Sequence, residues 1–186
     1  MKLYEVYTEI LKEIGELDPS KAYKFTKSLD EVKPTDKGTL EGRQIYNFGV
    51  EGHTKYGRFN RRTKKKGNTP LEVAISYKPN GQMRVDFGLD RWLNTQDDEP
   101  ILGDDYKSLY GIMNTVGTII LDSLRGTKDM GRVHGILAEP KRETDKANPK
   151  QRQLVYQLFL RKNMPGGKFA QMGKYYVLPE NYKDYL

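Results

Sequence analysis

Seven basic side chains crowd into one short stretch of the sequence that contains no acidic residue. Tyr56 and Phe59 lie within this stretch, which runs from Gly52 to Leu71. Sites for single-stranded nucleic acid combine cations that neutralise phosphates with aromatic rings that stack on bases. The stretch is therefore a candidate nucleic-acid-binding loop, and its candidate contact residues are Lys55, Arg58, Phe59, Arg61, Arg62, Lys64, Lys65 and Lys66.

The basic loop has a second interpretation. The chain has 32 Lys and Arg against 25 Asp and Glu, so removing the seven loop cations would bring the formal charge to zero. An exposed hairpin tip also uses lysines simply to stay soluble. We therefore expect either a contact with a polyanion (DNA, RNA or an acidic protein surface) or a solvated loop. The acidic segment Asp97–Asp105 could cap a helix, or it could face the basic loop in a homo-oligomer.

Other residue types with chemical potential are few. The chain has no Cys and two His, which excludes a thiolate zinc site, a cysteine nucleophile and a self-contained three-His metal centre. His53 and His134 are far apart, and a structural role is favoured for both. The paired aspartates at 97–98 and 104–105 lack the ligand at every second residue that calcium loops require. We expect no metal and no cofactor.

Four tyrosines near the C-terminus have two interpretations. They could stack on bases, or they could pack on strands and tie the end of the chain to the surface. These residues are Tyr175, Tyr176, Tyr182 and Tyr185.

Length and composition predict the class of protein. A chain of 186 residues suits one domain of ordinary size, or one domain with an arm. Its 11% aromatic content argues against disorder. No apolar run approaches the roughly 20 residues of a membrane span, and residues 1–16 are too acidic and too periodic for a signal peptide. We expect an intracellular, soluble protein without a membrane partner.

Periodicity predicts the elements that would position these residues. Residues 1–16 carry apolar side chains at helical spacing and form an expected amphipathic helix that ends at Gly15. Residues 17–41 read as a turn-rich linker. From residue 42 the pattern becomes that of strands, and the alternation in 71–78 and 82–92 around a turn at Lys78–Gly81 predicts a β-hairpin.

Two helices are expected in the second half of the chain. The first covers about 104–125, with Asp104 or Asp105 as N-cap and Gly126 after its end. Gly111 and Gly117 inside it indicate close approach to a sheet. The second covers 148–163 and begins at Asn148-Pro149. Strands are expected near 133–139 and 173–179.

The resulting order is β-β-β-α-β-α-β over residues 42–186. This order predicts an α/β (α+β) domain with a mainly antiparallel central sheet and two helices on the sheet faces.

This order resembles the GNAT (Gcn5-related N-acetyltransferase) fold, in which a long helix follows a long hairpin and a second helix follows one strand later. In that family an Asn opens the second helix and a Tyr near its middle serves as general acid to the departing coenzyme A thiolate. Asn148 and Tyr156 stand in similar places here. The resemblance thus implies a divergent N-acyltransferase that uses acetyl-CoA and Tyr156.

The sequence departs from the GNAT pattern at the pyrophosphate loop. The family has Q/R-x-x-G-x-G/A before the first long helix, where bare N–H groups bind phosphate. The matching segment here is Glu99–Asp105, with one Gly and with carboxylates at the expected helix N-terminus. These carboxylates suit the helix dipole but would repel a nucleotide pyrophosphate. We therefore expect no acetyl-CoA turnover.

A second resemblance is to small uncharacterised proteins encoded by tailed bacteriophages. It is carried by the segments Leu3–Glu16, Val85–Phe87, Met113–Ile120 and Arg152–Tyr156. It implies a viral origin, and a place in the host cytoplasm or in the virion.

Three functions follow as hypotheses. The first is a phage-encoded, non-catalytic, GNAT-like interaction protein that acts on virion proteins or on a host factor. The second is the divergent N-acyltransferase. The third is a sequence-independent nucleic-acid-binding module built on residues 55–66.

Overall fold

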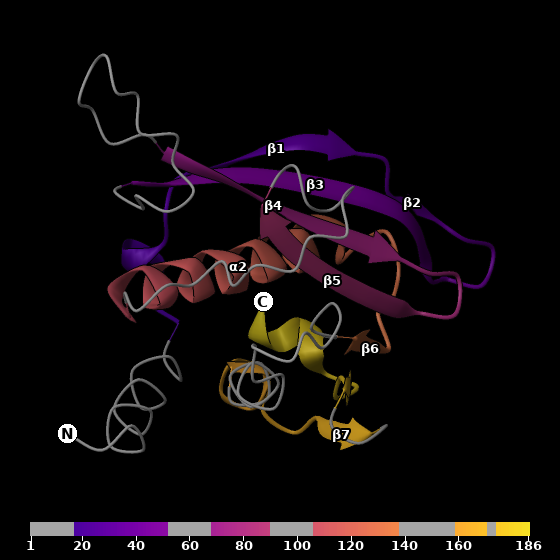
Figure 1. The fold of residues 1–186 in the computed structure, drawn as a ribbon. Coiled ribbons are helices and arrows are strands. Elements are labelled where there is room, and N and C mark those ends of the chain that lie inside the picture. Colours follow the sequence, from indigo (N-terminus) through magenta and orange to yellow (C-terminus); the bar gives the residue numbers. More distant parts are fainter. Residues whose placement is uncertain (1–16, 52–67, 90–105, 138–158, 171–173) are drawn as a thin grey trace, which may run out of the picture.

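The computed structural model describes residues 17–51, 68–89, 106–137, 159–170 and 174–186. The expected N-terminal helix at 1–16 lies outside the described residues, as does the greater part of the expected helix at 148–163. The described chain is an α+β structure built on a mixed, mostly antiparallel open sheet (Figure 1).

The sheet has eight strands, and seven of them follow the order β1-β3-β4-β5-β6-β8-β7. Their bounds are β1 Phe25–Asp30, β3 Leu40–Glu51, β4 Asn68–Tyr77, β5 Gln82–Leu89, β6 Gly135–Leu137, β7 Lys168–Ala170 and β8 Tyr175–Val177. The short β2, Lys33–Pro34, pairs with β3. All pairs are antiparallel except β5 with β6, which are parallel.

The predicted hairpin is confirmed. β4 pairs with β5 so that Ile75 faces Val85 and Val73 faces Phe87. Lys78 N–H bonds to the carbonyl of Gln82, and Gly81, at φ 81°, completes the turn. The alternation fixes the register because a slip by one residue would turn every apolar side chain to the opposite face.

The segment 17–41, which we expected to be a turn-rich linker, contains strands. β1 pairs with β3 along most of its length, with an irregularity between Lys27 and Leu29. The periodicity of β1 is weak because β1 is an edge strand whose side chains are mostly exposed or half-buried. An edge strand of this kind leaves little apolar alternation to read.

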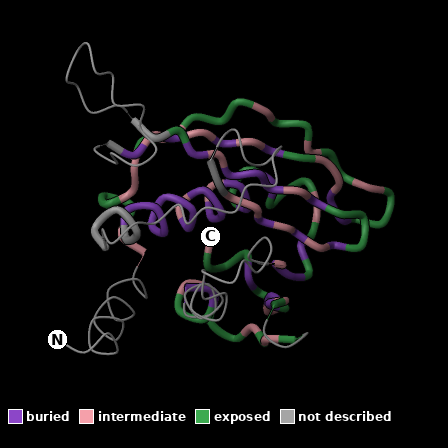
Figure 2. The backbone as a smooth tube through the Cα atoms, in the orientation of Figure 1, coloured by how far each residue is buried: buried purple, intermediate pink, exposed green. Residues whose placement is uncertain are grey.

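The first predicted helix is confirmed as α2, Tyr106–Thr127. Gly126 lies inside the helix instead of following it, and the chain turns one residue later, where Met130 N–H bonds to the Thr127 carbonyl. Figure 2 shows α2 buried along most of its length. A helix that is buried nearly all round must have neighbours on more than one side.

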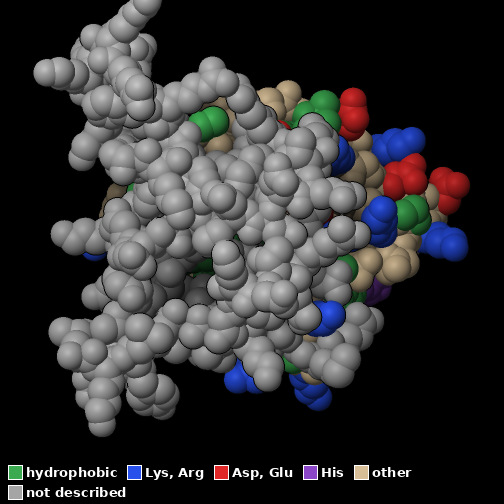
Figure 3. Space-filling view, viewed as in Figure 1, with side chains coloured by type: hydrophobic (Ala, Val, Ile, Leu, Met, Phe, Trp, Pro, Cys, Tyr) green, Lys and Arg blue, Asp and Glu red, His purple; other side chains and the backbone are tan. Residues whose placement is uncertain are grey.

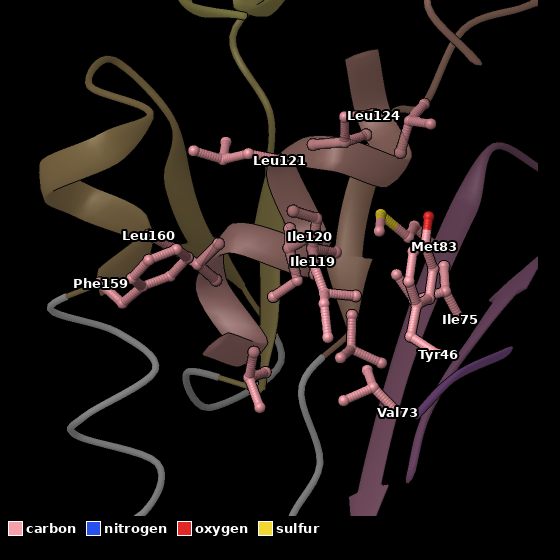
Figure 4. Close-up of a cluster of buried hydrophobic side chains, with 14 of the residues drawn as sticks. Tyr46, Val73, Ile75, Met83, Ile119, Ile120, Leu121, Leu124, Phe159 and Leu160 are labelled. Atoms are coloured by element: carbon pink, nitrogen blue, oxygen red, sulfur yellow. The ribbon is translucent and has the colours of Figure 1, made fainter. Parts of the chain in front are cut away.

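The neighbours of α2 are the sheet on one side and other helical segments on the other. Residues 159–163 are helical, and Phe159 and Leu160 from this segment lie on one side of α2, while Val73 and Ile75 approach from the sheet on the other (Figure 4). The resulting core includes Tyr46, Met83, Ile119, Ile120, Val116, Leu124, Ile136 and Tyr176, each at most 2% exposed.

The described helical segments lie on one face of the sheet. Helix α2, residues 159–163 and the 3₁₀ turns η1 (Pro19–Lys21) and η3 (Tyr182–Tyr185) lie on one side of the sheet (Figure 1). The opposite face, which we name the outer face, carries no described helix. Sequence order predicts that helices cross over the sheet, but it does not say over which face.

Both glycines inside α2 are points of close approach, as expected, but their partners are not strands of the sheet. A Cβ at Gly111 would collide with the ring of Tyr23, and one at Gly117 would collide with Phe159 and Leu17. The glycines therefore let the segment before β1 and the second helix pack closely against α2, and the Tyr23 ring also stacks on Phe48 of β3.

Candidate functional site

The residues predicted to carry function from the sequence fall largely outside the described chain. This applies to the basic loop with its eight candidate contact residues, to the acidic segment 97–105, to His53, and to Asn148 and Tyr156. Their predictions stay predictions. The described residues offer three other groups of polar side chains: a buried cluster, the outer face, and the C-terminal edge of the sheet.

The buried polar cluster joins α2 to strands β3 and β4. Ser123 of α2 donates a hydrogen bond of 2.5 Å to Gln44 Oε1 of β3, and its Oγ lies 2.5 Å from the Tyr77 hydroxyl of β4. Because Ser123 gives its proton to Gln44, Tyr77 donates to Ser123. Ser123 is fully buried, and Gln44 and Tyr77 are nearly so. Burying these groups costs little only because each has a partner.

Tyr46 connects the same cluster to Asp122. Its single hydroxyl proton is shared between two acceptors, Asp122 Oδ2 at 3.2 Å and Gln44 Oε1 at 3.3 Å. Burial raises the pKa of Tyr46 far above its ordinary value, and the carboxylate of Asp122 raises it further. Burial likewise raises the pKa of Tyr77. Both phenols therefore stay protonated at neutral pH and act as hydrogen-bond donors.

The cluster reaches the surface at Asp30. Gln44 Nε2 donates to Asp30 Oδ1 at 2.9 Å, and Lys27 Nζ lies 3.0 Å from Asp30 Oδ2. Partial burial favours the neutral acid, but the hydrogen bonds from Gln44 and Lys27 outweigh it and lower the pKa of Asp30. The cluster is thus a continuous chain of donors and acceptors from a surface carboxylate to the side of the helix.

Sequence reasoning missed this cluster although a signal existed. Ser123 and Thr127 follow the apolar Val116 and Ile120 at helical spacing. Polar residues on a buried helix face need partners on the facing element. Gln44, two residues before Tyr46 on the expected strand, was the available partner.

The outer face carries charged side chains that are balanced at its centre. Arg84 donates two hydrogen bonds to Asp86, at 2.9 and 3.2 Å, and Arg43 lies 3.9 Å from Glu72. Such pairs on a half-exposed face contribute little stability. They do make the middle of this face neutral.

The C-terminal edge of the sheet is basic. No acidic residue occurs from Lys146 to Pro179, and this stretch carries seven Lys and Arg. Four of these cations lie in the described chain, and all four are exposed: Arg161, Lys162, Lys168 and Lys174. Figure 3 shows basic and no acidic coloured side chains along the lower edge of the molecule, where β7 lies.

Sequence reasoning missed this second basic stretch because its cations are spread out. The loop at 52–71 places seven cations in 20 residues, whereas the C-terminal stretch places seven in 34. Folding concentrates the spread charge, since β7 and β8 pair and the end of the second helix lies beside them. The Arg161 guanidinium lies 5.2 Å from the centre of the Phe169 ring, and that ring lies 4.6 Å from Tyr176.

The four C-terminal tyrosines differ in how far they are buried. Tyr176 and Tyr182 are 1% and 2% exposed and serve packing: the Tyr176 hydroxyl donates to the Met164 carbonyl, and Val133 N–H donates to the Tyr182 hydroxyl. Tyr175 is half-buried on the outer face, and Tyr185 is exposed. The hypothesis of base stacking is therefore restricted to Tyr175 and Tyr185.

His134 lies at an exposed position where its ring covers Gly81 of the hairpin turn. Within the described ranges, no group of three or more His, Asp or Glu side chains is placed to hold a metal ion. Among the helices of the described residues, none combines the length and apolar character needed to cross a membrane.

The chain matches no protein-family model, no curated protein and no solved structure.

Proposed function

We propose that this protein is a phage-encoded interaction protein without catalytic activity, built on a GNAT-like fold. The fold proposal is supported by the chain order of an antiparallel β3–β4–β5 meander, helix α2, and a strand β6 parallel to β5. It is supported further by the helical residues 159–163 between β6 and β8.

The observation that carries the absence of catalysis is the buried polar cluster. Asp122, Tyr46, Tyr77 and Ser123 are the types of residue that acid–base chemistry uses, and they meet between α2 and the sheet. Each of these side chains is engaged with another, and the phenols have raised pKa values. A general base must instead reach a substrate proton with a pKa near the working pH. The cluster therefore serves to fix the helix on the sheet, and the protein acts through its surface.

The partner that suits this surface is a polyanion. The formal net charge is +7, and 14 of the 32 Lys and Arg fall into two long stretches without acidic residues. A basic surface attracts nucleic acid by releasing counterions, whatever the sequence. An acidic protein surface, of the virion or of the host, offers similar chemistry. The site of action would be the host cytoplasm or the virion.

One observation favours a second candidate, the divergent N-acyltransferase. β6 pairs with β5 only at Gln82–Arg84, so that the described part of β5 beyond Arg84 has an edge without a described partner strand on that side. Free strand edges bind extended ligands through main-chain hydrogen bonds. In this alternative acetyl-CoA would use that edge, and Tyr156 would act as general acid.

Thermal unfolding with added ligands tests the two candidates together. Only a ligand of the native state raises the unfolding midpoint. We expect a single-stranded oligonucleotide to raise the midpoint at low salt and acetyl-CoA to leave it unchanged. Replacement of Arg61, Arg62, Lys64, Lys65 and Lys66 by Ser should reduce the shift if the basic loop takes part.

A different result would overturn the proposal. A midpoint raised by acetyl-CoA, with acetyl transfer that slows in Tyr156→Phe, would establish the acyltransferase instead. A midpoint unmoved by either ligand would exclude the polyanion, and affinity purification from infected cells would then have to supply a protein partner.

A further inference from the structure

The outer face of the sheet ends in a small platform formed by β6, β8 and β7. Alternation along β8 buries Tyr176 on the α2 side and places Tyr175 and Val177 on the outer face. In register, Val177 lies between Gly135 of β6 and Lys168 of β7. Val177 is 40% exposed and is one of three large apolar side chains that the described residues leave exposed.

The ring of Tyr175 lies across Gly135. A Cβ at Gly135 would collide with the Tyr175 ring and its hydroxyl, so the absence of a side chain lets the ring lie against the neighbouring strand. Tyr175 remains half-buried, so part of its ring is open to solvent. A ring held in place on a sheet is the feature on which single-stranded bases stack in several nucleic-acid-binding folds.

Cations border this platform. Lys168 lies on the outer face in register with Val177, and Lys174 directly precedes Tyr175; both are exposed. Arg161 and Lys162 are also exposed, but they belong to the helix on the α2 side of the sheet, where Arg161 lies over Phe169, so they add positive charge to this edge without lining the platform. The pair Arg84–Asp86, two strands away, is balanced and adds no net charge.

We propose that the β6–β8–β7 platform binds single-stranded nucleic acid, with a base stacked on Tyr175 and phosphates on Lys168 and Lys174. The inference rests on the proposed function, since it assigns a surface and a partner class to an interaction protein. It is independent of the basic loop at 55–66. Because phosphates supply the affinity and no base edge is read, binding is independent of sequence.

The cations are tested by charge-matched variants of the full chain. Fluorescence anisotropy of a labelled oligothymidine, titrated at several salt concentrations, gives the slope of log K against log[salt]. The double change Lys168→Ser with Lys174→Ser should reduce the magnitude of this slope by about 1.4, at about 0.7 per phosphate contact on a single strand. The control, Lys33→Ser with Lys37→Ser, removes the same charge from exposed positions on and directly after β2, which β3, β4 and β5 separate from the platform, and should leave the slope unchanged.

The control removes lysines from a region where positive and negative side chains are mixed, so that no basic patch is lost. Lys33 pairs with Glu41 at 3.0 Å, and acidic and basic side chains alternate over the end of the sheet where β2 lies (Figure 3). An equal fall in slope for both double variants would mean that only net charge matters and would overturn the platform.

Stacking is tested by a pair of changes at Tyr175. Tyr175→Ala should weaken oligothymidine binding by about 5- to 150-fold, the range for loss of one stacked base. Tyr175→Phe keeps the ring and should bind as the natural protein does. A melting curve of each variant separates loss of fold from loss of binding, because Tyr175→Phe preserves the packing over Gly135.

The outcomes also separate this inference from the proposed function. If Tyr175→Ala and the double variant Lys168→Ser with Lys174→Ser bind the oligothymidine as well as the natural protein does, the proposed site on the platform is wrong. The proposed function as an interaction protein would then depend on another surface, such as the basic loop. If the natural protein binds no oligothymidine at low salt, the platform is also wrong. A duplex that binds as tightly as the single strand would contradict stacking on Tyr175.

Discussion

The Tyr77 hydroxyl on β4 lies 2.5 Å from Ser123 Oγ on α2, although the two residues are 46 positions apart. The Ser123 hydroxyl donates its own hydrogen bond to Gln44 on β3, so a single serine joins the helix to two strands. Hydrophobic burial has no direction, whereas these bonds fix where the helix sits along the strands.

Replacing Ser123 by Ala should destabilise the fold. The change removes one hydrogen bond from Gln44 Oε1 and one from the Tyr77 hydroxyl, both of which are buried, and we expect the free energy of unfolding to fall by about 1–3 kcal/mol. Urea denaturation measures it. The matched control is Thr118→Ala in the same helix, whose half-buried hydroxyl only bonds the Asn114 carbonyl, and which should change stability by less than about 0.5 kcal/mol. Equal effects for the two variants would contradict the role of Ser123.

The raised tyrosine pKa values predict a loss of stability in alkali. Tyrosines of the unfolded chain lose their protons near pH 10, whereas burial and Asp122 keep Tyr46 protonated in the folded chain. Above pH 10 the folded state therefore holds more protons than the unfolded state, and the free energy of unfolding falls as pH rises. Below that pH this contribution is fully present.

The variant Tyr46→Phe tests this assignment. It should be less stable than the natural protein at pH 7, by about 1 kcal/mol for the lost hydrogen bonds, yet lose less stability between pH 9 and pH 11. Urea midpoints across this range measure both effects. The exposed Tyr185→Phe is the control and should follow the natural protein. An unchanged alkaline slope in Tyr46→Phe would refute the assignment.

Ile119 should be among the most sensitive core positions. It is fully buried, between the sheet and the helical segments on the other side of α2 (Figure 4). Ile119→Ala removes apolar contacts and leaves a cavity, so we expect a loss of about 2–5 kcal/mol in chemical denaturation. Met130→Ala, at a position 36% exposed, should lie within about 0.5 kcal/mol of the natural protein.

Two glycines with positive φ should respond differently to alanine. Gly42 has φ 121°, and a Cβ there would collide with the carbonyl of Glu31, whereas Gly38 has φ 71° with nothing near. Gly38→Ala should therefore cost only the left-handed backbone strain, about 1–2 kcal/mol. Gly42→Ala must also displace the segment between β1 and β2, and should unfold at a lower denaturant concentration than Gly38→Ala. If Gly38→Ala unfolded at the lower denaturant concentration instead, the segment between β1 and β2 would have to move aside at little cost in free energy.

The elements with strong periodicity could be predicted from the sequence. These elements are the hairpin of β4 and β5, the strand β3 and the helix α2, each of which buries a regularly spaced set of apolar side chains. Met113 and Val116 of α2 are buried, as the helical spacing requires. β1 and β7 were not predicted. One is a largely exposed edge strand, and the other is three residues long, so neither contains enough alternation to read.

The polar sites were less predictable, because they depend on which elements meet. Tyr175 becomes a candidate only once Gly135 lies beneath its ring, and Lys168 only once β7 pairs with β8. Tyr176 and Tyr175 are adjacent in sequence and indistinguishable in type, yet strand alternation buries one and exposes part of the other. The cations Lys168 and Lys174 likewise come to lie at one edge of the sheet only because β7 pairs with β8.

The central claim, that this protein binds a polyanion through its surface and does not bind acetyl-CoA, is tested most directly by calorimetric titration of the full chain with each ligand at low salt. We predict saturable binding of a single-stranded oligonucleotide, weakened by salt in proportion to the phosphates contacted, and no binding of acetyl-CoA. Micromolar binding of acetyl-CoA would contradict the claim. Its loss on changing Asp104 and Asp105 to Lys would contradict it most clearly, because repulsion by those carboxylates requires the opposite sign.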